Sequence, residues 1–303
     1  MIQFERMDPA RRAEYASWLE LASHRGSGYC FANLYMWGCQ RTAVVDGHLL
    51  VFSNFEEHTL YPFPVGSGDP KRALEAIMDD AKKRGIPCRI AGMTAHEKEM
   101  LEEAFPGQFC FHCGRDNHDY VYDINDLAEL KGRRYQQKRN HINRFTLEQP
   151  DAYVEILTEE NLDACREFVE QWYARRAETD PEEDIAMERV AIARGFRHFR
   201  ELGLEGLMLY AGGKPIAMTM GSRLAEDTVD VHFEKADPNV HGAYPAINRA
   251  FARYIREKYP EVKYLNREDD MGDEGLRKAK LSYHPHHMVE KCWAHLRSED
   301  TDD

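Results

Sequence analysis

Ionisable side chains of both signs crowd one stretch of the chain, Asn266 to Pro285, with the sequence NREDDMGDEGLRKAKLSYHP. The stretch follows the strand-like segment VKYL and passes two turn glycines, Gly272 and Gly275, before a short predicted helix. So many charged groups would be costly to bury without partners. The end of a strand that leads into a helix N-terminus suits polar or anionic ligands, because free N–H groups point outward there. We therefore treat this stretch as a candidate binding site.

The side chains of this stretch form an acidic set and a basic set. Carboxylates and an amide at alternate positions suit an ammonium group in a shielded site. Two cations three residues apart on a helix share one face and suit a phosphate or a carboxylate. A salt-bridged turn that only stabilises the domain is the alternative, since ion-pair networks imitate binding sites. The candidate ligand-binding residues are Asn266, Glu268, Asp270, Arg277 and Lys280.

A block of cations is the second candidate. Residues 131–147 contain six Lys or Arg and no acid, in a chain whose net charge is −13. About four turns of helix would fit residues 132–145, and phosphate groups favour such basic arrays. A solvated connector helix is the alternative, because charge runs are usually solvated faces. The candidate donor-binding cations are Arg134, Lys138 and Arg139.

The strand-like segment TVDVHFEK alternates strictly between polar and apolar residues. Asp230, His232 and Glu234 are predicted to share one face of this strand. A carboxylate or imidazole within hydrogen-bond reach of an attacking amine can accept its proton, so His232 and Glu234 are candidate general bases. The alternative is a strand face that simply meets water. Further on, Gly242 precedes a predicted helix and could leave a backbone N–H cradle for a phosphate, or could be an ordinary helix start.

The composition limits the class of protein. The chain has 303 residues, 43% of them hydrophobic, which is enough for two domains with sizeable cores. We expect no membrane span and no signal peptide, because neither a long apolar run nor a hydrophobic N-terminal segment is present. Seven scattered cysteines indicate a reducing compartment, so we expect a cytoplasmic protein with unpaired cysteines. The negative net charge disfavours non-specific binding to nucleic acid or acidic lipid.

The order of the predicted elements repeats. Each half reads helix, helix, hairpin, strand, helix, strand, helix, strand, with hairpin turns at Asp46-Gly47 and Gly212-Gly213. The two halves share this order but not their sequence. We therefore predict two similar α+β domains joined by the basic block. The predicted boundaries are 1–128, a connector at 129–150, and 151–303.

This order, together with LKGRRYQQKRNHINRF and NREDDMGDEGLRKAKLSYHP, resembles the C-terminal domain of bacterial phosphatidylglycerol lysyltransferases. The resemblance covers nearly the whole chain and extends to the Fem peptidyltransferases, which take amino acids from tRNA. It implies tandem N-acetyltransferase-like (GNAT-like) domains, each with a mixed, mostly antiparallel sheet flanked by helices. The membrane-embedded part of the lysyltransferases is absent from this sequence, so the resemblance does not define a lipid acceptor.

The resemblance also implies roles for particular residues. The strand that carries His232 and Glu234 would line the cleft, and Tyr283 would protonate the leaving group. In acetyltransferases, the loop at the position of Gly242 binds the pyrophosphate of coenzyme A through several glycines. Only Gly242 is in place here, and an aminoacyl-tRNA terminus could use the same cradle. The second domain is therefore the expected working half, and the first its scaffold.

Three functions follow as hypotheses. The first is transfer of an amino acid from aminoacyl-tRNA to an amine or hydroxyl acceptor, by direct attack and without a required cofactor. The second is a coenzyme A-dependent N-acyltransferase, and the third is a non-catalytic binder of nucleotides or phosphorylated ligands. The acceptor could be a small molecule, a peptide or a lipid headgroup, and the sequence leaves the oligomeric state open.

Two clusters resemble metal sites. Cys110 and Cys113 have C-x-x-C spacing with His118 nearby, but a structural zinc site usually needs a second such pair. His284, His286 and His287 are close in sequence, yet no Asp or Glu lies at ligand spacing. We therefore expect no metal site.

Overall fold

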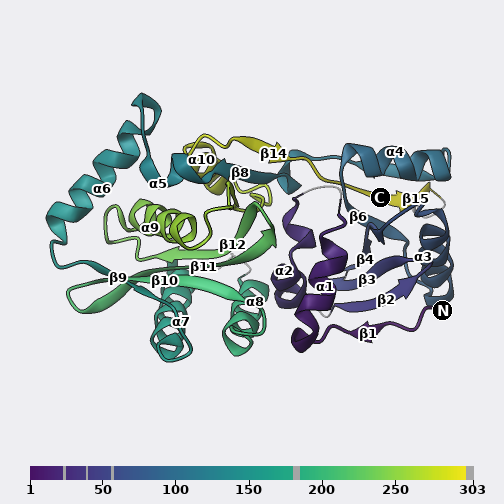
Figure 1. Ribbon diagram of the computed structural model, residues 1–303, viewed down its shortest axis with the longest axis horizontal. Helices are drawn as coiled ribbons and strands as arrows, with labels where there is room; N and C mark the ends of the chain where they lie inside the picture. The colour runs from purple at the N-terminus through teal and green to yellow at the C-terminus, as the bar shows by residue number, and fades with distance from the viewer. Residues whose placement is uncertain (23–24, 39, 56–57, 180–184, 298–303) are drawn as a thin grey trace. The chain divides into compact units, whose positions relative to one another are not determined.

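The computed structural model describes residues 1–22, 25–38, 40–55, 58–179 and 185–297 (Figure 1). These residues form two compact units, and neither unit is one continuous segment of the chain. Unit 1 contains residues 1–120, 269–278 and the C-terminal part from Met288 on. Unit 2 contains residues 121–268 and 279–287. Each unit combines a sheet with helices.

Unit 1 is built on a sheet with the strand order β1-β2-β3-β4-β6-β15-β7, in which β5 also pairs with β3. Its core contains Leu50, Tyr61, Ile77 and Ile90, which have no exposed surface. Its strands are β1 (Glu5–Arg6), β2 (Arg41–Val45), β3 (His48–Phe55), β4 (His58–Pro62), β5 (Val65–Gly66), β6 (Arg89–Met93), β7 (Phe109–His112) and β15 (Cys292–Leu296). Its helices are α1 (Arg12–Leu19), α2 (Phe31–Trp37), α3 (Lys71–Arg84) and α4 (Ala95–Ala104).

Unit 2 is built on a sheet with the strand order β14-β8-β13-β12-β11-β10-β9. The strands are β8 (Asp119–Asp123), β9 (Tyr153–Ile156), β10 (Leu204–Ala211), β11 (Lys214–Ala225), β12 (Thr228–Ala236), β13 (Tyr264–Asn266) and β14 (His287–Val289). The division between the units falls within β8 and within β14, so each of these two strands has residues in both units. The helices are α5 (Ile124–Glu129), α6 (Gln136–Glu148), α7 (Leu162–Thr179), α8 (Ala186–Arg197) and α9 (Ala243–Lys258), and α10 (Glu274–Leu281) begins in unit 1 and ends here.

Helix α9 covers one face of the unit 2 sheet, and α7 and α8 cover the other (Figure 1). Helix α9 packs on the sheet through one apolar face, because Ile247, Phe251 and Ile255 recur at every fourth position and are fully buried. The predicted hairpins are confirmed as β2–β3 and β10–β11. At Gly212 and Gly213 both φ angles are positive, at 55° and 69°, as a two-residue hairpin turn requires.

Each of the two sheets contains a strand from the other half of the sequence. Strand β8 comes from the predicted first domain but pairs with β13 in unit 2. Strand β15 comes from the end of the chain but pairs with β6 and β7 in unit 1. The compact units therefore do not follow the predicted boundaries at 128 and 150, because an order of elements does not determine which sheet a strand joins.

Strand β15 also brings two distant cysteines together. Cys113 follows β7, and Cys292 begins β15; they form a disulfide across 179 residues of sequence. The prediction of unpaired cysteines is therefore wrong for this pair. Local spacing suggested only Cys110 as a neighbour of Cys113, whereas Cys110 is not part of a disulfide in the described chain. None of the helices in the described part of the chain is long and apolar enough to cross a membrane.

Candidate active site

A bulge in β12 separates residues that the sequence places together. Thr219 of β11 lies opposite Glu234, and Ser222 lies opposite Asp230. Between these two pairs β11 advances by three residues and β12 by four, so β12 contains one extra residue. Thr219 and Ser222 are three residues apart in β11, so they face opposite sides of the sheet. Their partners Glu234 and Asp230 therefore face opposite sides as well. The prediction that Asp230, His232 and Glu234 share one face is therefore wrong.

Glu234 is held by two neighbours on the α9 side of the sheet. Arg267, which follows β13, donates from Nη2 to Glu234 Oε1 at 2.9 Å. Asn248 of α9 donates from Nδ2 to Glu234 Oε2 at 3.0 Å. The Glu234 and Arg267 side chains are only 10% and 13% exposed. Both carboxylate oxygens of Glu234 therefore accept hydrogen bonds, and one of them is paired with a cation.

Tyr283 and Lys138 complete this group. The Arg267 guanidinium carbon lies 5.0 Å from the centroid of the Tyr283 ring, and Lys138 Nζ lies 3.8 Å from it. Burial, with a further contribution from the Arg267 charge, lowers the pKa of Lys138 to about 8. Burial raises the pKa of the Tyr283 hydroxyl well above its usual value, so this hydroxyl keeps its proton.

Several polar groups around Glu234 lack a partner among the described residues. Lys138 Nζ makes no hydrogen bond or ion pair with any residue that the structure describes. Arg267 Nη1, Thr219 Oγ1 and Asn248 Oδ1 are buried and have no hydrogen-bond partner in the same part of the chain. Buried polar atoms are nearly always bonded. We call Lys138, Thr219, Glu234, Asn248, Arg267 and Tyr283 the Glu234 cluster.

His232 belongs to a separate, buried network. Its Nε2 lies 2.8 Å from Ser222 Oγ, and its Nδ1 lies 3.2 Å from Glu268 Oε1 and 3.5 Å from Asp230 Oδ2. The Glu268 N–H donates to Asn266 Oδ1 at 2.7 Å. The His232 and Asp230 side chains have no exposed surface. Asn266, Glu268 and His232 therefore form one group, on the side of β12 away from Glu234.

Asp270 and Arg277 pair with each other in unit 1. Arg277 donates from Nε and Nη2 to the two Asp270 carboxylate oxygens, both at 2.8 Å. Tyr120 donates to the same carboxylate at 2.5 Å. These bonds, chiefly those from Arg277, hold the pKa of Asp270 well below its usual value. This half of the stretch is thus the stabilising salt bridge that the sequence left open as an alternative.

The remaining predicted cations have structural partners. Arg134 pairs with Asp126 at 2.6 Å. Arg139 donates to the backbone oxygens of Leu130 and Gly132. Lys280 donates from Nζ to the Arg267 carbonyl at 2.6 Å, which supports the backbone of the Glu234 cluster. Of the three predicted donor-binding cations of the basic block, Lys138 alone joins that cluster among the described residues.

Gly242 is required by a helix contact. It has φ +81° and forms the N-cap of α9. A Cβ at this position would lie 2.4 Å from the His141 carbonyl oxygen and 2.9 Å from Phe145 Cβ, both on α6. The glycine therefore allows α6 to approach α9 closely. A phosphate is not needed to explain it.

Gly242→Ala should lower the free energy of unfolding by about 2–3 kcal/mol, because left-handed strain and the clash with α6 add together. Urea denaturation would measure this loss. Gly213→Ala is the matched control, since Gly213 has φ +69° but a Cβ added there would meet nothing within 4 Å among the described residues. Equal losses in the two variants would show that the α6 contact is unimportant.

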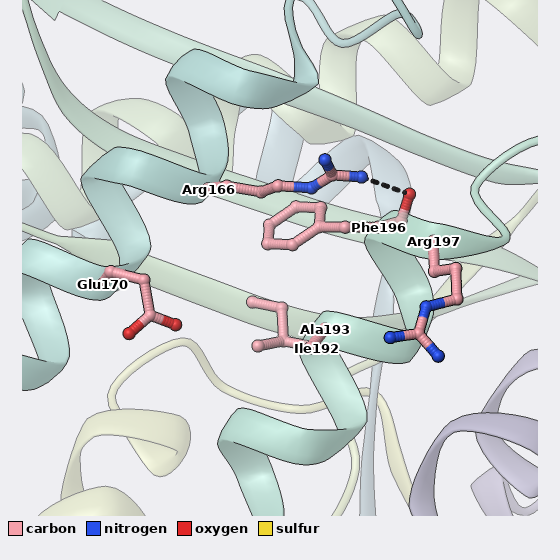
Figure 2. A pocket seen from close by; sticks show the side chains of 6 residues that line it. All are labelled: Arg166, Glu170, Ile192, Ala193, Phe196 and Arg197. Atoms are coloured by element: carbon pink, nitrogen blue, oxygen red, sulfur yellow. Dashed lines mark hydrogen bonds between the residues drawn. The ribbon is translucent and has the colours of Figure 1, made fainter.

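A groove is lined by residues of α7 and α8 (Figure 2). Its volume is about 430 Å³, and Ile192 and Phe196 are apolar residues of its lining. Arg166 on its rim is already engaged, since it donates to the Phe196 carbonyl at 3.1 Å and pairs with Asp163 at 2.9 Å. None of the predicted site residues lines this groove. We therefore place the candidate active site at the Glu234 cluster.

Three members of the Glu234 cluster do not follow from sequence reasoning. Arg267 lies inside the charged stretch, but the alternating pattern selects Asn266 and Glu268 and leaves out the residue between them. Thr219 and Asn248 come from distant elements and have ordinary residue types. Only the bulge in β12 and the packing of α9 identify them.

Comparisons with known proteins agree with this architecture. A profile of the family described as phosphatidylglycerol lysyltransferase, C-terminal, matches residues 19–295. An uncharacterized protein of Mycoplasmoides gallisepticum is 24% identical over 205 residues, which is 67% of this chain. The match spans only 63% of that relative's length.

Solved structures show the same fold. A conserved protein of unknown function from Bacteroides thetaiotaomicron is 37% identical, with a TM-score of 0.91 over 98% of this chain and 100% of that one. L-PGS from Bacillus licheniformis is 14% identical, with a TM-score of 0.70 over 99% and 95%. A tandem GNAT protein from the clavulanic acid biosynthesis pathway is 11% identical, with a TM-score of 0.52 over 99% of both chains. The predicted α+β fold with tandem acetyltransferase-like domains is confirmed.

Proposed function

Because this chain belongs to the family of phosphatidylglycerol lysyltransferase C-terminal domains, we propose that it transfers an amino acid from aminoacyl-tRNA to an amine or hydroxyl acceptor. Family and fold support a transferase of the aminoacyl or acyl type. The donor and the direct attack are our proposal. The observation that carries it is the Glu234 cluster, where a lysine amine without a described ion-pair partner and a tyrosine hydroxyl lie beside a buried Arg–Glu pair.

The cluster holds a candidate proton acceptor, Lys138, and a candidate proton donor, Tyr283. The acceptor nitrogen or oxygen bonds to the ester carbon and gives its proton to Lys138 Nζ. The bond between the ester carbon and the ribose oxygen breaks, and that oxygen takes a proton from Tyr283. Lys138 then gives its proton to water and Tyr283 takes a proton from water, which restores both groups. No covalent enzyme intermediate is needed, and Glu234 serves to hold Arg267.

A coenzyme A-dependent acyltransferase is the rival. Its pyrophosphate would use the loop at Gly242, but the missing side chain of this glycine is already explained by the close approach of α6. Because the α6 contact already accounts for Gly242, we favour an aminoacyl donor over coenzyme A. Calorimetry with acetyl-coenzyme A tests the rival, because saturable binding near micromolar concentration would support it.

Discharge of charged tRNA tests the proposal. The protein is incubated with pools of aminoacyl-tRNA at low and at moderate salt, since phosphate contacts weaken as salt rises. We expect loss of the ester faster than its spontaneous hydrolysis when an amine acceptor such as hydroxylamine is present. The absence of both discharge and binding at both salt concentrations would rule out this function.

The rate of transfer should depend on pH through Lys138. The amine accepts a proton only when it is neutral, so kcat/KM should rise with pH and level off above a pKa of about 8. Rates between pH 6 and 9.5, corrected for spontaneous ester hydrolysis, would measure this profile. Lys131→Met is the control, because Lys131 lies in the same block but pairs with Glu129 at 3.6 Å, and its profile should match the wild type. A flat profile between pH 7 and 9 would contradict the role of Lys138.

A further inference from the structure

Buried polar atoms without partners gather around Glu234 in the described part of the chain. Thr219 is fully buried, Asn248 is 2% exposed, and both lack a partner for one oxygen. Thr219 lies opposite Glu234 in the strand register, and Asn248 is bonded to Glu234. Arg267 is bonded to the other carboxylate oxygen and has Nη1 left over. The three unpartnered atoms therefore belong to the strand partner and the two hydrogen-bond partners of one carboxylate, Glu234.

Such an arrangement is unfavourable in an empty protein. A buried polar atom without a partner destabilises the folded state relative to a bonded one. Replacing the Thr219 hydroxyl by a methyl group would remove that cost without changing the shape. A bound ligand group that reaches the Thr219 hydroxyl would supply the missing bonds.

The unpartnered atoms define the chemistry of that group. Asn248 Oδ1 accepts hydrogen bonds only, the Thr219 hydroxyl donates or accepts, and Arg267 Nη1 only donates. The matching ligand carries N–H donors beside a carbonyl acceptor. An α-aminoacyl ester has this pattern, since its ammonium is attached to the carbon next to its carbonyl. A simple acyl group such as acetyl would leave Asn248 Oδ1 and the Thr219 hydroxyl without partners.

We propose that Thr219, Asn248 and Arg267 form a niche that recognises the free α-amine of the donor, with the ammonium at Asn248 and Thr219 and the ester carbonyl at Arg267 Nη1. This inference rests on the proposed function and adds its donor specificity. The Glu234 carboxylate beside the niche favours a cation there, and the Arg267 donor stabilises the negative charge that develops on the carbonyl oxygen during attack.

Two probes separate the free amine from its blocked form. One is 3′-(L-alanylamino)-3′-deoxyadenosine, which carries the α-amine on a stable amide, and the other is its N-acetyl derivative. By calorimetry, the wild-type protein should bind the free amine about 10-fold more tightly or better, because hydrogen bonds to charged groups are strong. In Thr219→Val this preference should fall several-fold, while the melting temperature stays the same or rises.

A matched variant controls for changes in the sheet. Thr228 of β12 is also buried, but its hydroxyl donates to Asp227 at 2.9 Å. Thr228→Val should lower the melting temperature and keep the wild-type preference for the free amine. A lower melting temperature in Thr219→Val would overturn the inference, because the hydroxyl would then serve stability.

The remaining outcomes distinguish the niche from the proposed function. Equal binding of the two probes by the wild-type protein, or discharge of N-acetylaminoacyl-tRNA as fast as aminoacyl-tRNA, would overturn the niche and leave the transfer reaction standing. Absence of probe binding together with absence of any tRNA discharge would overturn both. If aminoacyl-tRNA is discharged but Thr219→Val keeps the full wild-type preference for the free-amine probe, the niche alone would be overturned.

Discussion

Lys138→Met should reduce the discharge of aminoacyl-tRNA by about 100- to 10,000-fold, the range that general acid–base groups usually contribute. The stability of the protein should change little, because Lys138 makes no ion pair with a described residue and methionine keeps the apolar part of the side chain. Single-turnover rates with saturating enzyme would measure the loss. Urea denaturation of the same variant would show that the fold is intact.

Chemical rescue separates a proton acceptor from a binding residue. Small primary amines added to a Lys138→Ala variant should restore part of the rate, and more basic amines should restore more of it. Lys138→Arg should stay inactive, since a guanidinium does not lose its proton near neutral pH. A Lys138→Met variant that keeps more than about a third of the wild-type rate would contradict the proton path.

Arg267→Met should remove transfer and lower the free energy of unfolding by about 3–5 kcal/mol, because Glu234 would be left as a buried charge without its partner. The double variant Glu234→Met with Arg267→Met should recover much of this stability, since a buried ion pair replaced by apolar groups of similar size is often neutral. It should not recover activity. Urea denaturation and tRNA discharge would be measured on both variants.

An exposed pair provides the control for this prediction. Arg144 and Glu148 of α6 pair at 2.6 Å with side chains 61% and 43% exposed. Arg144→Met should cost less than about 1 kcal/mol, because water screens the pair. Similar losses in Arg267→Met and Arg144→Met, or no recovery in the double variant, would show that the Glu234 pair is not effectively buried.

Much of the fold is predictable from the chain itself. Turn pairs, caps and apolar spacing define hairpins such as β2–β3 and helices such as α9, and the resemblance to the lysyltransferase domain defines the tandem architecture. Of the candidate site residues, Lys138, Glu234 and Tyr283 lie near one another in unit 2. Their roles are our proposal.

The remainder depends on geometry that local patterns do not carry. A period of two assigns Asp230, His232 and Glu234 to one face, and a single extra residue in β12 reverses that assignment. The charged stretch reads as one feature, yet its Asp270–Arg277 part lies in unit 1 and its Arg267 part in unit 2. The pairing of Cys113 with Cys292 likewise follows from β15 and not from cysteine spacing.

The placement of β15 bears on how the protein is made in the cell. In the unit 1 sheet this strand lies between β6 and β7, yet it spans Cys292–Leu296 near the end of a chain of 303 residues. A ribosome would therefore finish β6 and β7 long before the strand that joins them exists. Until then their open edges could pair with other nascent chains. Completion of the first unit thus waits until β15 has been synthesised, and its amino-terminal part cannot mature as an independent piece.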